Sequence, residues 1–352
     1  MKLSKLWIIL RIVALSTFTV QPAASASESV GVRQIAAFSK ERGTHLDVTV
    51  WYPAHSGGKL VMLGESVFFE GTHAMRDATI SEGKFPLILL SHGAGLAGNA
   101  QALSWIAVPL AKQGFVVAAP THPGNTGANR SAAETIKLWL RPRDITDTLN
   151  AMRKDTFFKG YLDNEAIGAL GLSMGGGTAL AIAGARIDPK RLAGYCDTDK
   201  LNPSFCEWVR QSGVDLHALD LRPAGRDNKD ERIRFAMAID PVPVDVFDFD
   251  TFSQISAPIE LVNMGQPTKI PLTANASEIA KVIPNATYFT IEDASHYSMF
   301  AVCKPGASEI AESEKIGDPI CMDGGGRTRS EIHTQLINSV IAAFTRELKP
   351  HH

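Results

Sequence analysis

The side chain whose surroundings most clearly indicate chemistry is Ser173, in the run Gly171-Leu-Ser-Met-Gly175. An apolar segment of strand length precedes this run, and a segment rich in small residues, typical of a helix, follows it. A G-x-S-x-G run between a strand and a helix is a nucleophile elbow, a tight turn that lifts the serine hydroxyl above a sheet. Both glycines are expected because side chains at positions 171 and 175 would collide with neighbouring backbone. Such a run is also common by chance, so an ordinary serine in a glycine-rich strand–helix junction is the alternative.

A serine nucleophile needs a base that accepts its proton and a third group that orients the base. In proteins built around this elbow the chain order is serine, acid, histidine. His296 is the expected base because it follows a predicted strand, at the sheet edge from which Ser173 also emerges. A structural loop histidine is the alternative for this residue. Of the other histidines late in the chain, His351 and His352 lie at the C-terminus, and His333 falls early in a predicted helix, where a solvated surface histidine is expected.

Asp240 is the expected acid. The commonest position for the acid is after the penultimate strand, but residues 262–267 contain no carboxylate. One strand earlier, the apolar run 235–239 ends in Asp240. A carboxylate is costly to bury there without a partner, and an imidazole N–H is a suitable one. Asp245 is the reserve candidate, for which a surface turn residue is the alternative.

Two preorganised N–H donors are needed for the oxyanion that forms during acyl transfer. One is the amide of Met174, directly after the nucleophile, at the N-terminus of the predicted helix. The other is expected in the run His92-Gly-Ala-Gly95, with the amide of Ala94 as the donor. His92 precedes the serine in the chain, so it is interpreted as a structural histidine and not as the base.

The remaining sequence predicts the elements that must position these groups. Alternating residues predict two antiparallel strands near the N-terminus, and the Gly-rich segment 54–84 predicts an irregular surface excursion. Further along, continuous apolar runs predict buried strands that alternate with helices, which favours a mainly parallel sheet with helices on both faces. The predicted buried strands are 85–91, 115–119, the strand before Ser173, 233–239, 258–263 and 286–291. The predicted helices are 102–113, 141–154, the elbow helix to about 186, 275–282 and 330–348.

Two segments interrupt the alternation, at about 188–232 and 297–329, and are interpreted as insertions in a single domain spanning 27–352. These insertions and the loop 121–140 are expected to cover the active-site pocket. Two tryptophans in these segments could line the pocket or belong to the core. They are Trp139 and Trp208.

The first residues predict export. Lys2 and Lys5 precede an apolar run at 12–20, and Ala24-Ser-Ala26 is a small-residue cleavage site, so residues 1–26 are typical of a secretory signal peptide. The apolar run is too short to span a bilayer, and an uncleaved anchor is the alternative. The formal net charge is −2, with no basic stripe that would indicate nucleic-acid binding.

Four cysteines in an exported chain favour disulfides. Pairing between neighbours in the sequence, Cys196 with Cys206 and Cys303 with Cys321, would close each insertion separately. None of the four has metal-ligand spacing, so no metal site is predicted.

Six short runs characterise the chain as a whole: Ser91-His-Gly-Ala-Gly95, Thr121-His-Pro-Gly-Asn125, Leu140-Arg-Pro-Arg-Asp144, Gly171-Leu-Ser-Met-Gly175, Ala238-Ile-Asp240 and Ser295-His296. In these runs, over roughly residues 30–345, the sequence resembles α/β-hydrolases related to platelet-activating-factor acetylhydrolases, often labelled predicted dienelactone hydrolases. The resemblance implies an α/β-hydrolase fold, and the acid after the earlier strand resembles the acetylhydrolases. True dienelactone hydrolases use a cysteine nucleophile, whereas this chain has Ser173.

Together these features predict a periplasmic or secreted serine hydrolase that cleaves carboxylic esters of small molecules through an acyl-enzyme, without a cofactor. An amidase or peptidase on the same fold is one alternative. A non-catalytic binding protein on a hydrolase scaffold is another, although such scaffolds typically lose a member of the triad and here all three positions can be filled.

Overall fold

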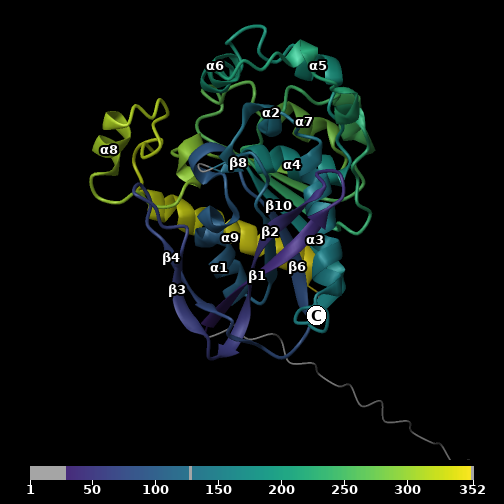
Figure 1. Ribbon diagram of the computed structural model, residues 1–352, viewed down its shortest axis with the longest axis vertical. Coiled ribbons are helices and arrows are strands. Elements are labelled where there is room, and N and C mark those ends of the chain that lie inside the picture. The colour runs from purple at the N-terminus through teal and green to yellow at the C-terminus, as the bar shows by residue number, and fades with distance from the viewer. Residues whose placement is uncertain (1–28, 127–128, 350–352) are drawn as a thin grey trace, which may run out of the picture.

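The computed structural model describes residues 29–126 and 129–349 (Figure 1). The predicted signal peptide, residues 1–26, lies outside the described residues. A mixed sheet of eleven strands crosses the described part of the chain, and β5 (Thr79–Ile80) pairs with β2 at its margin. The order of the other strands is β13 (Ala286–Ile291), β12 (Ile259–Met264), β11 (Phe235–Ile239), β10 (Leu162–Leu172), β6 (Phe85–Ser91), β7 (Val116–Pro120), β2 (Thr44–Ser56), β1 (Ser29–Ser39), β4 (Thr72–Arg76) and β3 (Lys59–Leu63).

The six strands from β13 to β7 run parallel, and β2 joins them antiparallel to β7. Their carboxyl ends therefore meet at one edge of the sheet. Side chains alternate between the two faces, so Leu87 and Leu89 of β6 pack into one core while Ile88 and Leu90 pack into the other. Burial on both faces explains why this strand is a continuous apolar run in the sequence.

Helices cover both faces, as predicted. The core that contains Leu87 includes α3 (Leu140–Lys154) and α4 (Met174–Ala183). The core on the opposite face includes α1 (Ser104–Lys112) and the closing helix α9 (Arg329–Leu348), which starts at a capping box formed by Thr328 and Glu331. This layered architecture places the start of α4 directly above the carboxyl end of β10.

The segment 54–84 differs from the expected irregular excursion, because it supplies three strands of the sheet. β3 and β4 form an antiparallel pair, and β4 pairs in parallel with β1 at Gly31 and Met75. These strands are short and mostly exposed or half-buried, so their alternation of polar and apolar residues is weak. The glycines around them therefore suggested an irregular segment.

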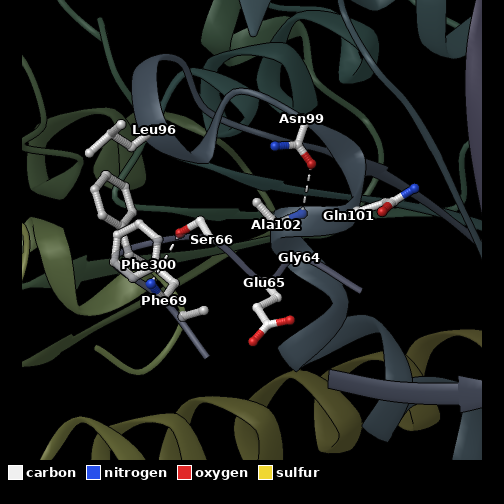
Figure 2. A pocket seen from close by; sticks show the side chains of 10 residues that line it. Gly64, Glu65, Ser66, Phe69, Leu96, Asn99, Gln101, Ala102 and Phe300 are labelled. Atoms are coloured by element: carbon white, nitrogen blue, oxygen red, sulfur yellow. Dashed lines mark hydrogen bonds between the residues drawn. The ribbon is translucent and has the colours of Figure 1, made fainter. Parts of the chain in front are cut away.

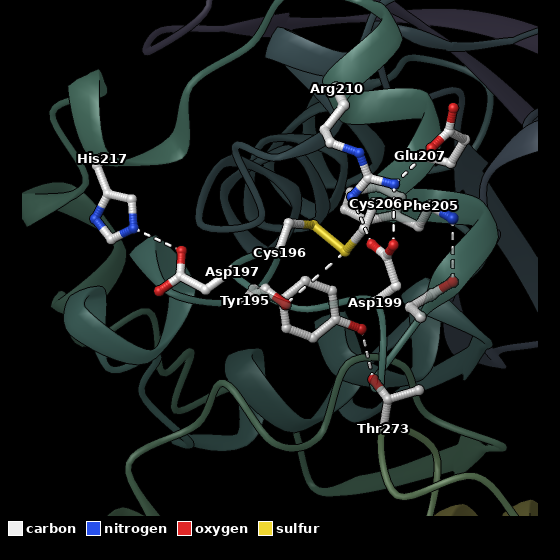
Figure 3. The surroundings of a disulfide bond; sticks show 11 residues. Tyr195, Cys196, Asp197, Asp199, Phe205, Cys206, Glu207, Arg210, His217 and Thr273 are labelled. Atoms are coloured by element: carbon white, nitrogen blue, oxygen red, sulfur yellow. Dashed lines mark hydrogen bonds and ion pairs between the residues drawn. A yellow bond between two sulfur atoms is a disulfide. The ribbon is translucent and has the colours of Figure 1, made fainter.

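The two cysteine-bearing segments are helical and each contains a disulfide. The pairs are Cys196–Cys206 and Cys303–Cys321, which is the pairing expected from proximity in the sequence. Figure 3 shows the first pair beside Tyr195, whose hydroxyl lies 2.6 Å from the Oγ1 of Thr273. The short helices of these and neighbouring segments are α2 (Ala132–Thr135), α5 (Pro189–Ala193), α6 (Pro203–Gln211), α7 (Ser277–Val282) and α8 (Ala307–Ser313).

In Figure 1, α5 and α6 lie together at one end of the molecule, and α8 stands at its side. The loop 121–140 contacts the first insertion, because the guanidinium of Arg130 lies 4.2 Å from the ring centre of Trp208. Trp139 is buried in the core instead of lining an open pocket. Over the described ranges, none of the helices combines the length and the apolar character needed to cross a membrane.

Candidate active site

Ser173 occupies a sharp turn between β10 and α4. Its φ of 56° and ψ of −123° are a strained conformation for a residue with a side chain. The flanking glycines permit the turn, because a Cβ on Gly171 would lie 1.8 Å from the carbonyl oxygen of Gly175. A Cβ on Gly175 would lie 1.9 Å from the carbonyl oxygen of Ser91. The half-buried Ser173 is therefore held at the carboxyl edge of the sheet, with part of its surface open to solvent.

The structure brings Ser173, His296 and Asp240 together, although they are far apart in the chain. The Oγ of Ser173 lies 3.0 Å from Nε2 of His296, and Nδ1 of His296 lies 2.5 Å from Oδ2 of Asp240. A carboxylate can only accept, so Nδ1–H donates to Asp240 and leaves Nε2 free to accept the serine proton. The side chain of His296 is 30% exposed, whereas that of Asp240 is 2% exposed.

Asp240 lies directly after β11 and is held by the next strand. Its Oδ1 accepts hydrogen bonds from the side-chain amide of Asn263 at 2.8 Å and from the backbone N–H of Met264 at 2.9 Å. Its other oxygen remains for His296. The reserve candidate, Asp245, does not take this place, and burial raises the pKa of its carboxyl.

Asn263 is a site residue that the sequence analysis missed. It is fully buried near the end of β12, within the segment 262–267 that contains no carboxylate. Its amide nitrogen also donates to the carbonyl of Ala274, and its oxygen accepts from the N–H of Ala276 and the hydroxyl of Tyr288. The signal was available, because an amide at the end of an apolar strand needs partners when it is buried.

His296 begins a short 3₁₀ turn, η6 (His296–Met299), which is stabilised by hydrogen bonds to the second insertion. Ser295 donates its hydroxyl to the carbonyl of Met322 at 2.7 Å, and Ser298 donates to Asp323 at 2.5 Å. Residues directly after the Cys303–Cys321 loop therefore help to fix the position of the imidazole.

His333 was expected on the surface, and the structure corrects this. It is buried, its Nε2 lies 2.8 Å from the carbonyl oxygen of Ser298, and its ring stacks on Trp105 with centroids 3.8 Å apart. Burial lowers its pKa to about 4. The expectation failed because the first turns of α9 pack beneath the His296 turn, which the local helical pattern does not reveal.

Two different segments near Ser173 carry the predicted oxyanion donors, because Met174 follows it directly and the loop of Ala94 approaches it at Gly93. The carbonyl of Ser173 accepts from the N–H groups of Gly176 at 2.8 Å and Val242 at 3.1 Å. In a trans peptide the N–H points opposite to the C=O, so these bonds fix the direction of the Met174 N–H.

His92 acts on the second predicted donor in the same way. Its Nδ1 lies 2.7 Å from the carbonyl oxygen of Gly93, whose peptide carries the N–H of Ala94. Its Nε2 accepts from the backbone N–H of His122 at 3.0 Å, so the neutral ring donates through Nδ1. Burial lowers its pKa well below the usual value. A Cβ on Gly93 would lie 3.2 Å from the Cβ of Ser173, so this backbone approaches the nucleophile closely. These contacts agree with a structural His92.

A second Ser–His–Asp series, which was not predicted from the sequence, starts directly before this loop at Ser91. The Oγ of Ser91 lies 2.9 Å from Nε2 of His122, and Nδ1 of His122 lies 2.8 Å from Oδ2 of Asp144. Asp144 also accepts from the guanidinium of Arg42 at 2.8 and 2.9 Å, and Ser39 lies 3.3 Å away. All members of the series are buried, and burial lowers the pKa of His122 well below the usual value.

A cavity of about 230 Å³, shown in Figure 2, is lined by residues that follow two segments of the site in the chain. It is bordered by Leu96, two residues beyond Ala94, and by Phe300, which ends the His296 turn. Phe69 completes an apolar side, where its ring contacts that of Phe300 at a centroid distance of 5.6 Å. Polar residues form the opposite side, among them Glu65, Asn99 and Gln101.

Comparisons with known proteins place this arrangement in a fold class. A model of the prolyl oligopeptidase family matches residues 101–190, about a quarter of the chain. No curated protein sequence matches the chain. Among solved structures, a ferulic acid esterase from Streptomyces cinnamoneus has a TM-score of 0.61 at 17% identity, covering 94% of this chain and 92% of that one. A puromycin-hydrolyzing peptidase of Mycobacterium tuberculosis has a TM-score of 0.48 at 14% identity, covering 91% of this chain and 40% of that one.

The parallel central strands, the helices on both faces and the likeness to the esterase structure define the α/β-hydrolase fold. The predicted fold class is therefore confirmed. At 17% identity the esterase structure shows a shared fold, and the reaction has to be argued from the side chains of this chain.

Proposed function

We propose that this chain is a serine hydrolase that cleaves carboxylic esters, with Ser173 as nucleophile, His296 as base and Asp240 as the orienting acid. The observation that carries the proposal is the series of hydrogen bonds from Ser173 through His296 to Asp240 at a strained, partly exposed turn. The neighbouring amides of Met174 and Ala94 supply the oxyanion donors. The resemblance to platelet-activating-factor acetylhydrolases, in which the acid also follows the earlier strand, supports the same assignment.

The proposed reaction follows from the geometry. As the Oγ of Ser173 attacks the ester carbonyl, Nε2 of His296 accepts the hydroxyl proton and Asp240 stabilises the imidazolium that forms. The carbonyl oxygen becomes negative and accepts hydrogen bonds from the Met174 and Ala94 amides. When the intermediate collapses, the alcohol leaves with the proton from His296. A water molecule deprotonated by His296 then hydrolyses the acyl-enzyme and restores Ser173.

The cavity lined by Leu96 and Phe300, which lie close in the chain to Ala94 and His296, is the proposed place for an apolar part of the ester. Leu96, Phe69 and Phe300 offer an apolar and aromatic wall, and the 230 Å³ volume suits a ring or a short acyl chain better than a long lipid chain. A panel of nitrophenyl esters of graded acyl length, with aryl esters added, tests this. Turnover should be greatest for short acyl chains or aromatic groups, and a preference for long acyl chains would contradict the placement.

Labelling with a fluorophosphonate probe tests the nucleophile. The purified protein should react at Ser173, as located by peptide mass spectrometry, and Ser173→Ala should neither react nor hydrolyse esters. Labelling at another serine would contradict the assignment. The proposed mechanism uses no metal, so turnover should survive treatment with a chelator. Loss of turnover on chelation, restored by a divalent ion, would contradict the reaction class.

A peptidase or amidase is the second candidate, because the prolyl oligopeptidase family model matches the segment that contains Ser173. Matched pairs of nitrophenyl esters and nitroanilides with the same acyl group distinguish the two. Comparable kcat/KM values for ester and anilide would favour the peptidase, whereas cleavage of the ester alone favours the esterase.

We also infer that the protein is exported. The two disulfides fit an oxidising compartment and agree with the predicted signal peptide. N-terminal sequencing of protein recovered from outside the cytoplasm should give a chain that begins at Ser27. A retained N-terminus would support the uncleaved anchor instead.

A further inference from the structure

Arg141 is a buried cation that the proposed mechanism does not use. It lies at the start of α3, with 2% of its surface exposed, and is among the largest fully enclosed side chains of the described residues. Burying a guanidinium is costly unless its charge and its donors are compensated. The contacts of Arg141 therefore indicate why a cation is buried at this place.

Two of its nitrogens connect the two sides of the predicted oxyanion hole. One terminal nitrogen donates to the carbonyl of His92, in the loop that carries Ala94. Nε donates to Oγ1 of Thr178 at 3.1 Å, and this hydroxyl donates in turn to the carbonyl of Met174 at 3.1 Å. One planar side chain thus links the Ala94 loop to the first turn of α4.

The link also orients backbone donors. The His92 carbonyl that Arg141 binds shares a trans peptide with the N–H of Gly93, so this N–H is directed away from the guanidinium. The ring of His92 binds the carbonyl of Gly93 and so fixes the direction of the next peptide in the same way. Two successive peptides of the loop are therefore anchored through their carbonyls on the buried side, next to a backbone position that approaches Ser173 closely.

Among the described residues, Arg141 makes no contact ion pair, although the charge of Asp144 is near it. The nearby carboxylate of Asp144 is occupied by Arg42, His122 and Ser39, and makes no hydrogen bond to Arg141. Burial lowers the pKa of Arg141 to about 9, so the guanidinium stays positive at neutral pH. Its remaining terminal nitrogen has no hydrogen-bond partner among the described residues. A cation in this state attracts any negative charge that forms near Ser173.

We propose that Arg141 is a positioning residue that fixes the spacing of the two sides of the oxyanion hole, by binding the His92 carbonyl and Thr178 together, and that its positive charge favours the oxyanion. This rests on the proposed function, because it deepens the role of the same site. Arg141 does not touch the substrate, so it acts on the transition state through the backbone that it holds.

The test compares Arg141→Met and Arg141→Lys with the wild type in steady-state hydrolysis of one nitrophenyl ester. Removing a single oxyanion donor costs about 10²–10³ in kcat in other serine hydrolases. We expect Arg141→Met to lower kcat by about 10² while KM changes less than about threefold. Arg141→Lys keeps a charge but lacks the planar fork, so its loss should be intermediate.

A trifluoromethyl ketone analogue of the ester supplies a readout that a purely structural role would not change. It forms a tetrahedral adduct on Ser173 with a negative oxygen, so its inhibition constant should rise by the same factor by which kcat falls. Thr178→Val should lower kcat by about tenfold and Thr178→Ser should restore it, because serine keeps the hydroxyl that joins Arg141 to Met174. Arg232→Met is the matched control, since Arg232 contacts Asp230 and Asn150 away from the site, and its kcat should stay within about twofold of the wild type.

The outcomes separate this proposal from the proposed function. If the wild type is not labelled by the fluorophosphonate probe and hydrolyses no ester, the proposed function fails. If the wild type is active, two results overturn the role of Arg141. One is a kcat for Arg141→Met within about threefold of the wild type, and the other is an unchanged inhibition constant in a folded variant whose kcat has fallen. Circular dichroism establishes folding, and the Thr178 pair, which leaves Arg141 in place, provides the same test if Arg141→Met does not fold.

Discussion

Two Ser–His–Asp series lie in this molecule, and their distances are nearly the same. In the exposed series, Ser173 lies 3.0 Å from His296, which lies 2.5 Å from Asp240. In the buried series the corresponding distances are 2.9 Å from Ser91 to His122 and 2.8 Å from His122 to Asp144. Hydrogen-bond geometry alone does not distinguish a nucleophile from a structural serine.

What differs is the surroundings of each serine. Ser173 sits at a strained turn, half-buried, with amide groups beside it, whereas Ser91 is the last residue of the buried strand β6. His122 is completely enclosed, so no substrate carbonyl can reach Ser91. The buried carboxylate differs too, because Asp144 is paired with the guanidinium of Arg42. The comparison teaches that access and preorganised donors define the reactive series, while the same hydrogen bonds in the dry interior hold loops together.

The largest expected difference is between the two serines. Ser173→Ala should lower kcat by at least about 10⁴, because it removes the nucleophile. Ser91→Ala leaves an unpaired nitrogen on His122, which costs about 1–3 kcal/mol of unfolding free energy, and should keep kcat within about tenfold. Steady-state kinetics and urea unfolding of both variants measure this. If Ser91→Ala lost its turnover while it remained fully folded, the buried series would contribute to catalysis.

Substitution of the two aspartates should likewise have different effects, on turnover for Asp240 and on stability for Asp144. Asp240→Asn keeps the shape but favours the wrong tautomer of His296, and a loss of about 10⁴ in kcat is known for such a change in a serine protease. Asp144→Asn leaves the buried guanidinium of Arg42 without its carboxylate, so it should cost about 3–5 kcal/mol of stability and little turnover per folded molecule. Asp245→Asn is the local control, with a kcat loss of less than about tenfold. If Asp245→Asn were inactive and Asp240→Asn active, the acid would be misassigned.

The last expected effect is on stability alone and not on turnover, namely the dependence of the unfolding free energy on pH. Burial lowers the pKa of His92, His122 and His333, so the folded protein keeps them neutral while the unfolded chain binds protons below about pH 6.5. Their contribution is fully present above pH 6.5 and is lost as the pH falls towards the folded values. For His333, with a folded pKa of about 4, the loss between pH 6.5 and 4 is on the order of 3 kcal/mol.

Urea unfolding at several pH values between 7.5 and 4 checks this. His333→Gln can still donate to the carbonyl of Ser298 but does not titrate, so its unfolding free energy should fall less steeply with acid than that of the wild type. If the unfolding free energies of the two proteins fell equally with acid, a group other than His333 would cause the pH dependence.

Much of the fold could be predicted because its signals are local. β6 is buried on both faces and is therefore an apolar run, and the elbow at Ser173 needs glycines within two residues of it. Asp240 could be chosen because a charge ends an apolar strand. In each case the sequence immediately around a residue reflects the environment that this residue has in the fold.

The features that were missed depend on which distant segments meet. His122 and Asp144 were noticed only as parts of short runs, because the loop after β7 and the helix α3 must first be packed together before their contact exists. The burial of His333 depends in the same way on the turn that contains Ser298. β3 and β4 were missed since their alternation is short and their pairing with β1 is not local.

The position of β13 has a consequence for how the protein loses activity. This strand is at the edge of the sheet, pairs only with β12 among the described strands, and is mostly half-exposed, yet His296 depends on it. Edge elements open at a lower free energy than the core, so partial opening of β13 withdraws the base while β6 and β10 remain folded. Heat should therefore inactivate the protein at a temperature below that of its cooperative unfolding, and cooling should restore activity. Met322 and Asp323, directly after the Cys303–Cys321 disulfide, bind the segment around His296 and Arg329 at the start of α9. They tie the edge of the sheet to α9 and should bring the inactivation temperature closer to the unfolding temperature.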